Sequence, residues 1–459
     1  MTFSGKADQD RWPGVSWAGV RRLIWLVAFL AAFGAGLTGP THATDYYVAP
    51  PPVGDDANPG TVESPWATLQ HAAQTVQPGD KILVRAGSYA GAQFTTSGTA
   101  ELPIELKAFP GEEVRITANN ASTPDGINLE GASYMVVEGL RVDGRTRAGI
   151  RAVLCEHVTL RGNRVDGNGK WGIFTAFCDD LLIEDNHASN SNDQHGIYAS
   201  NSGDRPVIRG NRIWGNNHAG IHVNGDASQG GDGIISEAVI EANVIFDNGE
   251  GGASGINMDG VQDSLIRNNL LYDNHASGIS VFRIDGGGPS SGNRIYNNTV
   301  LVASDGRWAL NIRDGSTDNK VRNNVFYNFH AFRGSMHVAT DSLADFSSDH
   351  NAVMDRFTVD DGNTVLTLAQ WRQLTGQDQS SFLTTPDDLF VDPDTDDYHH
   401  REGSPALDSG ETLPEVPTDI EGTPRPIGPA YDIGVYEGLG AIFADGFESG
   451  DSSRWLTRP

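Results

Sequence analysis

The sequence predicts an all-β protein, a right-handed parallel β-helix, and a repeat in two registers is the main evidence. A Gly-Ile pair, or Ala-Leu in the same role, recurs at spacings of 23, 23, 24, 24, 35, 23 and 31 residues. A second apolar register ends each time in asparagine, at Asn163, Asn186, Asn211, Asn243, Asn269, Asn298 and Asn324. One unit is too short to bury its own apolar face. Parallel stacking of the units, about 4.8 Å apart, supplies the core.

The composition agrees with this fold class. Hydrophobic residues make up 38% of the chain and there are 55 glycines, which favours many turns and short strands over a helical bundle. The chain has 60 acidic and 32 basic residues and a net charge of −28. Nucleic acid is therefore a poor partner, because phosphate binding needs a basic surface. An acidic chain is suited to solubility outside the cell and to calcium binding.

The chain divides into five parts. Residues 1–43 are expected to be an export signal, with a basic pair at Arg21 and Arg22, an apolar core and the small residue Ala43 at its end. A retained anchor is the alternative, but the apolar run is short for a membrane span. Residues 44–120 are expected to form an N-terminal cap, with a short helix from near Ser64, and the first rungs. The repeats follow in 121–340.

The C-terminal parts break the repeat. Residues 341–440 are expected to form an irregular covering region with one amphipathic helix in "TLAQWRQLTGQDQSS", and 441–459 a polar tail. Asparagine tolerates turn conformations and bonds to backbone, so the asparagine column is expected to stabilise the coil. Cys155 and Cys178 lie 23 residues apart and should stack on adjacent rungs. Both a disulfide and two buried thiols remain open at this point.

Both ends of the chain resemble a known group. "YYVAP", "SPWATLQHAAQTVQPGDKILVRAGSY", "HREGSPALDSG" and "DIGVYEG" resemble the ends of bacterial secreted β-helix proteins of the pectate-lyase-like superfamily, over 45–438. The resemblance implies a bacterial protein that is secreted or held in the periplasm or at the cell surface. It implies an extracellular polysaccharide as partner, and we expect a monomer. Many relatives are calcium-assisted polysaccharide lyases, and others are epimerases or hydrolases.

Strand alternation brings candidate site residues together. If the isoleucine of each pair points inward, the next residue points outward. Phe174, Tyr198, His222, Asn257 and Ser280 should then form one vertical file on the outside of the coil. β-Elimination from a uronic acid needs a base, an acid for the departing O4 oxygen and a group that neutralises the carboxylate. We assign these roles to His222, Tyr198 and Asn257.

Further residues flank this file. In calcium-dependent relatives a lysine or arginine often serves as the base, which would favour Lys170 or Arg283. The expected substrate-binding residues are Phe174, Asn224, Arg151, Arg307 and Arg313. Asp226, Asp232, Asp259 and Asp263, from a glycine-rich insertion and its surroundings, are candidate ligands for Ca²⁺.

Two other function classes remain open. A glycoside hydrolase needs two carboxyl groups, and "NMDG" is similar to the Asn-x-Asp of β-helix polygalacturonases. The paired aspartates expected one rung later are replaced by "SVFR", so Asp259 needs Asp285 or Asp226 as its partner. A non-catalytic β-helix that binds glycan or builds an envelope layer is the third class. The sequence favours the lyase.

Overall fold

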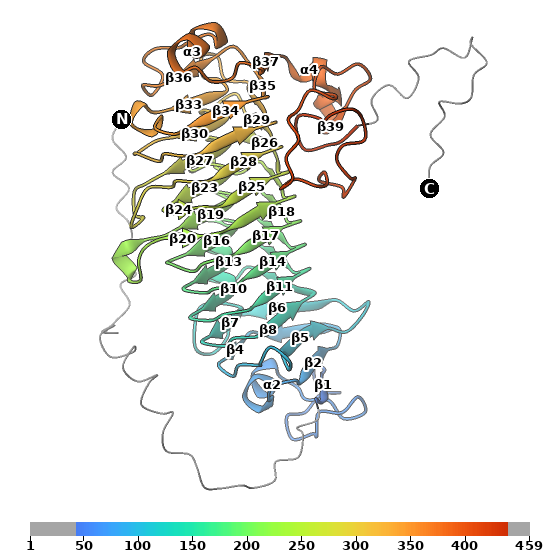
Figure 1. Cartoon of the computed structure of the whole chain (residues 1–459). Helices are drawn as coiled ribbons and strands as arrows, with labels where there is room; N and C mark the ends of the chain where they lie inside the picture. Colours follow the sequence, from blue (N-terminus) through green and yellow to red (C-terminus); the bar gives the residue numbers. More distant parts are fainter. Residues whose placement is uncertain (1–42, 439–459) are drawn as a thin grey trace, which may run out of the picture.

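The computed structural model describes residues 43–438 and shows a right-handed parallel β-helix, as predicted (Figure 1). Three parallel sheets run along one coil, and each turn of the coil contributes one strand to each sheet. Apart from Ala43, the predicted export signal lies outside the described residues, as does the predicted tail of 441–459. No helix in 43–438 is both long and apolar enough to cross a bilayer.

The strands of each sheet are given in order from the N-terminal end of the coil. Sheet A consists of β1 (Asp45–Val48), β2 (Lys81–Val84), β5 (Ile104–Ala108), β8 (Met135–Glu138), β11 (Thr159–Arg161), β14 (Leu182–Glu184), β17 (Val207–Arg209), β21 (Val239–Glu241), β25 (Leu265–Arg267), β28 (Arg294–Tyr296), β31 (Lys320–Arg322) and β34 (Ser347–Asp349). Sheet B consists of β3 (Gly87–Ala90), β6 (Val114–Ala118), β9 (Leu140–Asp143), β12 (Arg164–Asp166), β15 (His187–Ser189), β18 (Arg212–Trp214), β22 (Val244–Phe246), β26 (Leu270–Asn274), β29 (Thr299–Val302), β32 (Val325–Asn328), β35 (Ala352–Val353) and β37 (Phe382–Leu383). Sheet C consists of β4 (Ala92–Phe94), β7 (Ile127–Glu130), β10 (Ala148–Val153), β13 (Trp171–Ala176), β16 (Ile197–Ser200), β19 (Ile221–Asn224), β23 (Ile256–Asp259), β27 (Ile279–Phe282), β30 (Leu310–Ile312), β33 (Met336–Val338) and β36 (Phe357–Thr358).

The core lies inside the coil and is built by the repeated aliphatic residues. In sheet C the isoleucine of each Gly-Ile pair stacks on the isoleucine of the next rung, and Ile173, Ile197 and Ile221 are all 0% exposed. A strand places alternate side chains on opposite faces, so the residue after each isoleucine faces outward. This alternation sets the register of the candidate site.

The asparagine column forms a hydrogen-bonded ladder inside the coil. Asn243 shows the pattern: its Oδ1 accepts from the backbone N–H and Nδ2 of Asn211 at 3.0 and 2.9 Å, and its Nδ2 donates to Oδ1 of Asn269 at 2.9 Å. The ladder continues to Asn351. The predicted structural role of these amides is confirmed, because each satisfies buried polar groups on two neighbouring rungs.

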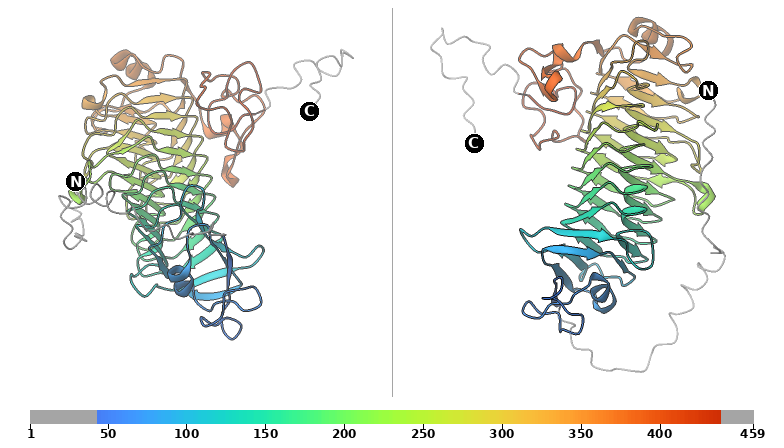
Figure 2. Two further views of the ribbon diagram at one scale, coloured as in Figure 1. Left: turned by 60° about the horizontal axis from the view of Figure 1, so that its bottom comes forward. Right: turned by 180° about the vertical axis from the view of Figure 1, so that it is seen from behind.

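A short helix covers the N-terminal end of the coil, and it begins at Leu69 and not near Ser64 as predicted (Figure 2). Helix α2 (Leu69–Thr75) begins after Thr68, whose side chain accepts a hydrogen bond from the backbone N–H of His71. The side-chain oxygen of Gln70 accepts from the backbone N–H of Gln93 in β4 at 3.0 Å. The helix therefore satisfies part of the free edge of sheet C, which otherwise offers unpaired backbone groups.

At the other end the coil extends further than residue 340, because β34, β35, β36 and β37 add strands to all three sheets. Helix α3 (Leu368–Thr375) begins with a capping box between Thr367 and Gln370. Its Trp371 is 0% exposed and stacks on Phe357 of the last rung of sheet C, with ring centroids 5.3 Å apart. Helix α3 thus closes the coil.

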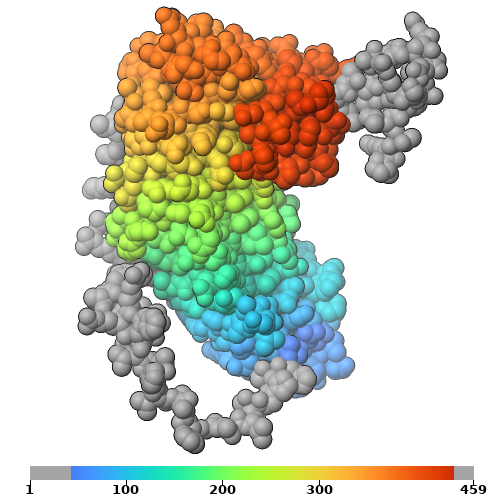
Figure 3. All heavy atoms as spheres, viewed as in Figure 1, coloured from blue at the N-terminus to red at the C-terminus, as the bar shows by residue number. Residues whose placement is uncertain are grey.

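The segment after α3 folds back along the outside of the coil (Figure 3). It contains α4 (Pro386–Leu389) and the antiparallel pair β38 (Phe390–Asp392) and β39 (Asp397–His400). Phe390 and Tyr398 pack with outward residues of sheet B, including Tyr272, and Val416 packs with Tyr296 of sheet A. The segment therefore lies on sheets A and B, and the candidate site lies on sheet C.

Polar contacts outside the coil also join neighbouring rungs. His275 lies between two aspartates, with Nε2 at 3.0 Å from Asp247 and Nδ1 at 3.0 Å from Asp305. Although partial burial opposes the charge, these two carboxylates raise the pKa of His275. The remaining short elements are η1 (Ala227–Gln229), η2 (Thr340–Ser342), η3 (Pro393–Thr395), β20 (Ile235–Ser236) and β24 (Val261–Gln262).

Candidate functional site

The predicted file of side chains exists on the outer face of sheet C. Phe174 pairs with Tyr198, Tyr198 with His222, His222 with Asn257, and Asn257 with Ser280 on successive rungs. The file continues upward through Asn311 and His337. We call these residues the sheet C file.

The lower part of the file is aromatic. The rings of Phe174 and Tyr198 meet edge to face with centroids 5.4 Å apart, and Trp171 stacks on Phe174 at 4.4 Å. His195 lies one rung above Trp171 and packs edge to face on Tyr198 at 5.1 Å. Tyr198 is half-buried while Phe174 is 8% exposed, so the phenol is the part of this group that reaches the surface.

The hydroxyl of Tyr198 is oriented to donate its proton. Nδ2 of Asn224 donates to the Tyr198 oxygen at 3.1 Å. The amide of Asn224 is fixed, because its Oδ1 accepts from the backbone N–H of Asp226 at 3.2 Å. The phenolic oxygen therefore accepts from Asn224 and its own proton is left for another acceptor. Burial, with the nearby carboxylates, raises the pKa of Tyr198, so it keeps this proton at neutral pH.

The ring of His222 is neutral and carries its proton on Nε2. The side-chain oxygen of Asn257 accepts from the backbone N–H of Ser254 at 3.1 Å, so Nδ2 of Asn257 faces Nδ1 of His222 at 3.3 Å. Because Nδ1 accepts this hydrogen bond, the proton must lie on Nε2. Burial, with the neighbouring His218, lowers the pKa of His222 to about 3.

A second histidine, His195, also favours the neutral form of His222. The ring of His195 stacks on His222 with centroids 4.6 Å apart and planes 14° apart. Nδ1 of His195 accepts from the backbone N–H of Ala219 at 3.1 Å, so His195 is also an Nε2–H tautomer. Burial and the nearby His222 and His218 lower the pKa of His195. Two stacked imidazoles at this separation disfavour charge on either one.

The upper part of the file is a polar network. The hydroxyls of Ser254 and Ser280 lie 2.7 Å apart, and Nδ2 of Asn311 donates to the Ser280 hydroxyl at 3.3 Å. Nδ1 of His337 donates to Oδ1 of Asn311 at 2.7 Å. Hydrogen-bonded polar groups thus follow the coil from His222 to His337.

The two predicted alternative bases lie at opposite edges of sheet C. Lys170 is half-buried just before β13, and its Nζ lies 5.6 Å from the centre of the Trp171 ring. Arg283 is exposed just after β27, and its Nε donates to the carbonyl of Gly286 at 3.2 Å. Lys170 therefore lies beside the aromatic group of the file, while Arg283 belongs to the loop at the other edge.

Of the predicted substrate-binding arginines, Arg151 has the expected position in the outer column of sheet C, but its side chain is covered. It is only 3% exposed, and Nη1 donates to Asn128 at 2.7 Å and pairs with Glu130. Glu130 on the rung below neutralises its charge, so the structure does not favour the predicted contact between Arg151 and substrate. Arg313 is exposed but pairs with Asp314 at 3.1 Å, and Arg307 is half-buried at the same edge as Lys170.

The four predicted calcium ligands do not form a ligand set. Within 43–438 no group of three or more His, Cys, Asp or Glu side chains is arranged to hold a metal ion. Both oxygens of Asp259 already accept from backbone N–H groups of residues 284–286, at 2.8–3.0 Å. Asp226 binds Ser228, Asp232 binds the N–H of Ile234, and Asp263 lies in a separate turn. These side chains do not fit a preformed calcium site, and calcium dependence stays a prediction.

Asp226, Asp259 and Asp285 nonetheless lie close enough to influence one another. Burial raises the pKa of Asp259, and Asp226 raises it further. Partial burial raises the pKa of Asp285, with contributions from Asp259 and Asp226. The partner that the hydrolase hypothesis requires for Asp259 is therefore present near it.

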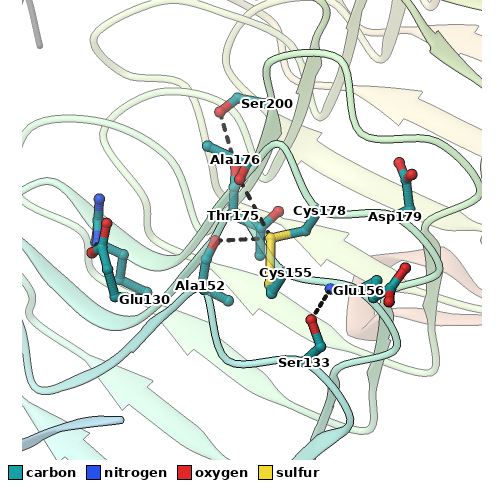
Figure 4. The surroundings of a disulfide bond; sticks show 12 residues. Glu130, Ser133, Ala152, Cys155, Glu156, Thr175, Ala176, Cys178, Asp179 and Ser200 are labelled. Carbon is teal, nitrogen blue, oxygen red and sulfur yellow. Dashed lines mark hydrogen bonds and ion pairs between the residues drawn. A yellow bond between two sulfur atoms is a disulfide. The ribbon is translucent and has the colours of Figure 1, made fainter. Parts of the chain in front are cut away.

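Cys155 and Cys178 are joined in a disulfide (Figure 4). Their Cα atoms lie 4.7 Å apart on adjacent rungs, and both side chains are buried. Of the two states that the sequence leaves open, the structure has the bonded one.

Trp171 and His195 belong to the site although the repeat pattern did not predict them. Both stand directly before the repeat glycine, and each ring packs against the aromatic ring three positions later. The sequence position directly before each repeat glycine could have identified them, because it holds these two aromatic residues on adjacent rungs.

Known proteins share the fold and part of the sequence. The family model described as "Pel9A-like, right handed beta helix region" matches residues 46–324. Pectate lyase PEL9 of Emericella nidulans is 38% identical over 96 residues, which cover 20% of this chain and 21% of that protein. YwoF of Bacillus subtilis is 31% identical over 80 residues, 17% of each chain. The chain spans about a fifth of the length of the curated relatives it matches.

Two solved structures superpose on most of the coil. The structure of pectate lyase Pel9A matches with a TM-score of 0.57 at 17% identity. The match covers 87% of this chain and 98% of the Pel9A chain. The complex of XylC with xylose has a TM-score of 0.56 at 12% identity, with 86% and 98% covered. These likenesses show the fold. The family model matches more than half of the residues and shows that the chain belongs to the Pel9A-like right-handed β-helix family.

Proposed function

We propose that this protein is a polysaccharide lyase that cleaves a uronate-containing glycan by β-elimination. The observation that carries the proposal is the Tyr198–His222 pair on the open face of sheet C, in which the phenol has a proton to donate. A family model and a curated relative, both named for pectate lyases, support a uronate substrate.

Tyr198 is the proposed acid. In β-elimination a base removes the C5 proton, the C4–C5 double bond forms, the C4–O4 bond breaks, and O4 leaves with a proton. The phenol supplies that proton, because Asn224 occupies its acceptor side and leaves its O–H free. General acid catalysis of this kind contributes about 10²–10⁴-fold to a rate.

His222 has two proposed roles that the structure makes distinguishable. As the base, the neutral ring accepts the C5 proton, but the hydrogen bond from Asn257 means that the tautomer must first reverse. As a donor, Nε2–H bonds the substrate carboxylate, and Lys170, one rung below Tyr198 and two rungs below His222, becomes the base. Asn257 positions His222 in either case, so its predicted contact with the carboxylate gives way to a positioning role.

Substitutions of His222 separate these roles. Glutamine keeps an N–H donor and cannot act as a base, whereas alanine removes both functions. If His222 is the base, His222→Gln and His222→Ala lose activity alike. If His222 is a donor, His222→Gln retains much more activity than His222→Ala, and Lys170→Met loses the most.

The reaction class is tested by a panel of polyuronates with and without a chelator. A lyase forms an unsaturated uronate that absorbs ultraviolet light, and each cleavage raises this absorbance together with the reducing ends. Absence of ultraviolet product on every polyuronate would refute the lyase. The chelator arm tests calcium dependence separately.

A glycoside hydrolase is the second candidate, and the proximity of Asp226, Asp259 and Asp285 favours it. Asp259 binds three backbone N–H groups, so Asp226 and Asp285 would form the working pair. This enzyme would produce reducing ends without ultraviolet absorbance, and Asp285→Asn would abolish them. A glycan binder would produce neither and would still be retarded in a gel that contains the glycan.

A further inference from the structure

A group of arginines and exposed aromatic residues lies beside the upper end of the sheet C file, on the rungs of Asn311 and His337 and the rung above them. Arg307 and Arg333 occupy equivalent positions on neighbouring rungs, since β30 pairs with β33, and Nη1 of Arg333 donates to the carbonyl of Gly306 at 3.1 Å. Arg356 follows on the next rung, with Nη1 at 2.8 Å from the carbonyl of His330 and 3.3 Å from that of Arg333. We call Arg307, Arg333 and Arg356 the arginine strip.

The strip is a local concentration of positive charge in a chain of net charge −28. Arg333 and Arg356 bind backbone carbonyls, and neither has a carboxylate within ion-pair distance in residues 43–438. Burial lowers the pKa of Arg307, with Arg333 and Arg313 contributing through charge repulsion. Guanidinium groups held together in this way favour an anionic ligand, and they bind carboxylates through paired hydrogen bonds.

An exposed aromatic loop, 329–334, borders the strip. Phe329 and Phe332 are 49% and 52% exposed, and the Arg333 guanidinium lies 5.4 Å from the centre of the Phe332 ring. His330 packs edge to face on Phe332 at 4.5 Å. Exposed aromatic rings beside cations are suited to a ligand with both apolar and anionic faces, such as a uronate ring.

The strip lies in line with the candidate active site. Arg307 stands at the same edge of sheet C as Lys170 and His218, two residues before the repeat position. The rung of Arg307 is three rungs above His222, which is about 14 Å at about 4.8 Å per rung. Between them the sheet C file is polar. A glycan chain lying along the coil would therefore pass from Tyr198 to the strip.

We propose that the arginine strip and the Phe332 loop form a distal subsite that binds the carboxylates of a polyuronate chain, three to five rungs from His222. This inference deepens the proposed function and rests on it for the acidic glycan. It places the carboxylates at the edge of sheet C that carries Lys170, His218 and Arg307. The opposite edge carries Asp226, Asp259 and Asp285 and would repel them.

The test measures binding separately from turnover. Each variant is made in a Tyr198→Phe background and run in gels that contain polygalacturonate, alginate or neutral hydroxyethylcellulose. The test proteins are Arg333→Gln/Arg356→Gln and, as a variant that cannot disturb backbone contacts, Phe332→Ala. The matched control is Arg164→Gln/Arg401→Gln, which removes the same charge from exposed positions away from sheet C. Thermal unfolding verifies that each variant is folded.

We expect the strip variant to bind at least one polyuronate about tenfold more weakly than the control, which corresponds to about 1.4 kcal/mol. A disaccharide of the same uronate is too short to reach both sites, and its binding should not change. Equal retardation of the strip variant and the control overturns the inference, as does an equal loss for the disaccharide. If neither polyuronate retards the parent protein, the inference is also overturned.

The two proposals fail in different ways. Ultraviolet product without retardation by the polymer leaves the lyase intact and removes the distal subsite. Strip-dependent retardation with no ultraviolet product in the protein with Tyr198 intact leaves the subsite intact and removes the lyase.

Discussion

One substitution on the next rung, at Asn257, should change both the tautomer and the pKa of His222. Asn257 now donates to Nδ1 of His222 at 3.3 Å and holds its proton on Nε2. Asn257→Asp replaces this donor with a carboxylate oxygen that can only accept when ionised. The tautomer should therefore reverse, with Nδ1–H donating to Asp and Nε2 left without a proton.

The expected shift in the pKa of His222 can be worked out from its buried position in the parent protein. Burial holds the pKa of His222 at about 3. An opposite charge at such a distance raises the pKa of a histidine by about 1 to 3. The variant should therefore titrate between about 4 and 6, whereas His222 in the parent protein should stay neutral throughout that range.

NMR titration of the ring nitrogens measures both the pKa and the tautomer. Asn192→Asp, which places the same charge in an exposed turn, is the control and should leave His222 unchanged. The reasoning is refuted if His222 of the parent protein titrates near 6.5, or if Asn257→Asp leaves its proton on Nε2. If His222 is the catalytic base, the variant should also shift the acid limb of the pH–rate profile.

Three further predictions concern stability. Asn243→Ala should lower the free energy of unfolding by about 4 kcal/mol, at about 1 kcal/mol for each of four hydrogen bonds; Asn192→Ala, as the exposed control, should change urea unfolding by less than about 0.5 kcal/mol. Because the folded pKa of His275 is raised above its ordinary 6.5, its stabilisation is complete below about pH 6.5 and is lost as pH rises through the folded pKa. His275→Asn should flatten that part of a plot of Tm against pH, and an unchanged plot would contradict this. Cys155→Ala/Cys178→Ala removes a disulfide between cysteines 23 residues apart and should lower the free energy of unfolding by about 3 kcal/mol. Reductant should then have no further effect on the Tm of the variant.

The fold and the file were predictable because both follow from spacing. A repeat near 23 residues fixes which side chains stack, so Phe174, Tyr198 and His222 could be aligned without coordinates. The end of the coil was harder to place. After Ala309 the repeat position is held by Ser335 and then Arg356, so the Gly-Ile signal disappears while β33 and β36 still pair.

The chemistry of individual side chains depended on contacts that spacing does not specify. Arg151 faces outward as expected, but Glu130 on the rung below neutralises it. Asp259 has the expected position, yet a loop 25 residues later occupies its oxygens. The proton position on His222 follows from the amide of Asn257, whose orientation is set by Ser254. Such contacts join different rungs and require the folded coil.

The most direct test of the lyase is the initial rate of ultraviolet absorbance on the polyuronate that the parent protein cleaves, compared between the parent and Tyr198→Phe. The substitution removes one hydroxyl from the sheet C file and leaves the ring in place. We expect the rate to fall about 10²–10⁴-fold while retardation of the protein by the same polymer is unchanged. A rate within about twofold of the parent would contradict the assignment of Tyr198 as the acid and, with it, the proposed active site.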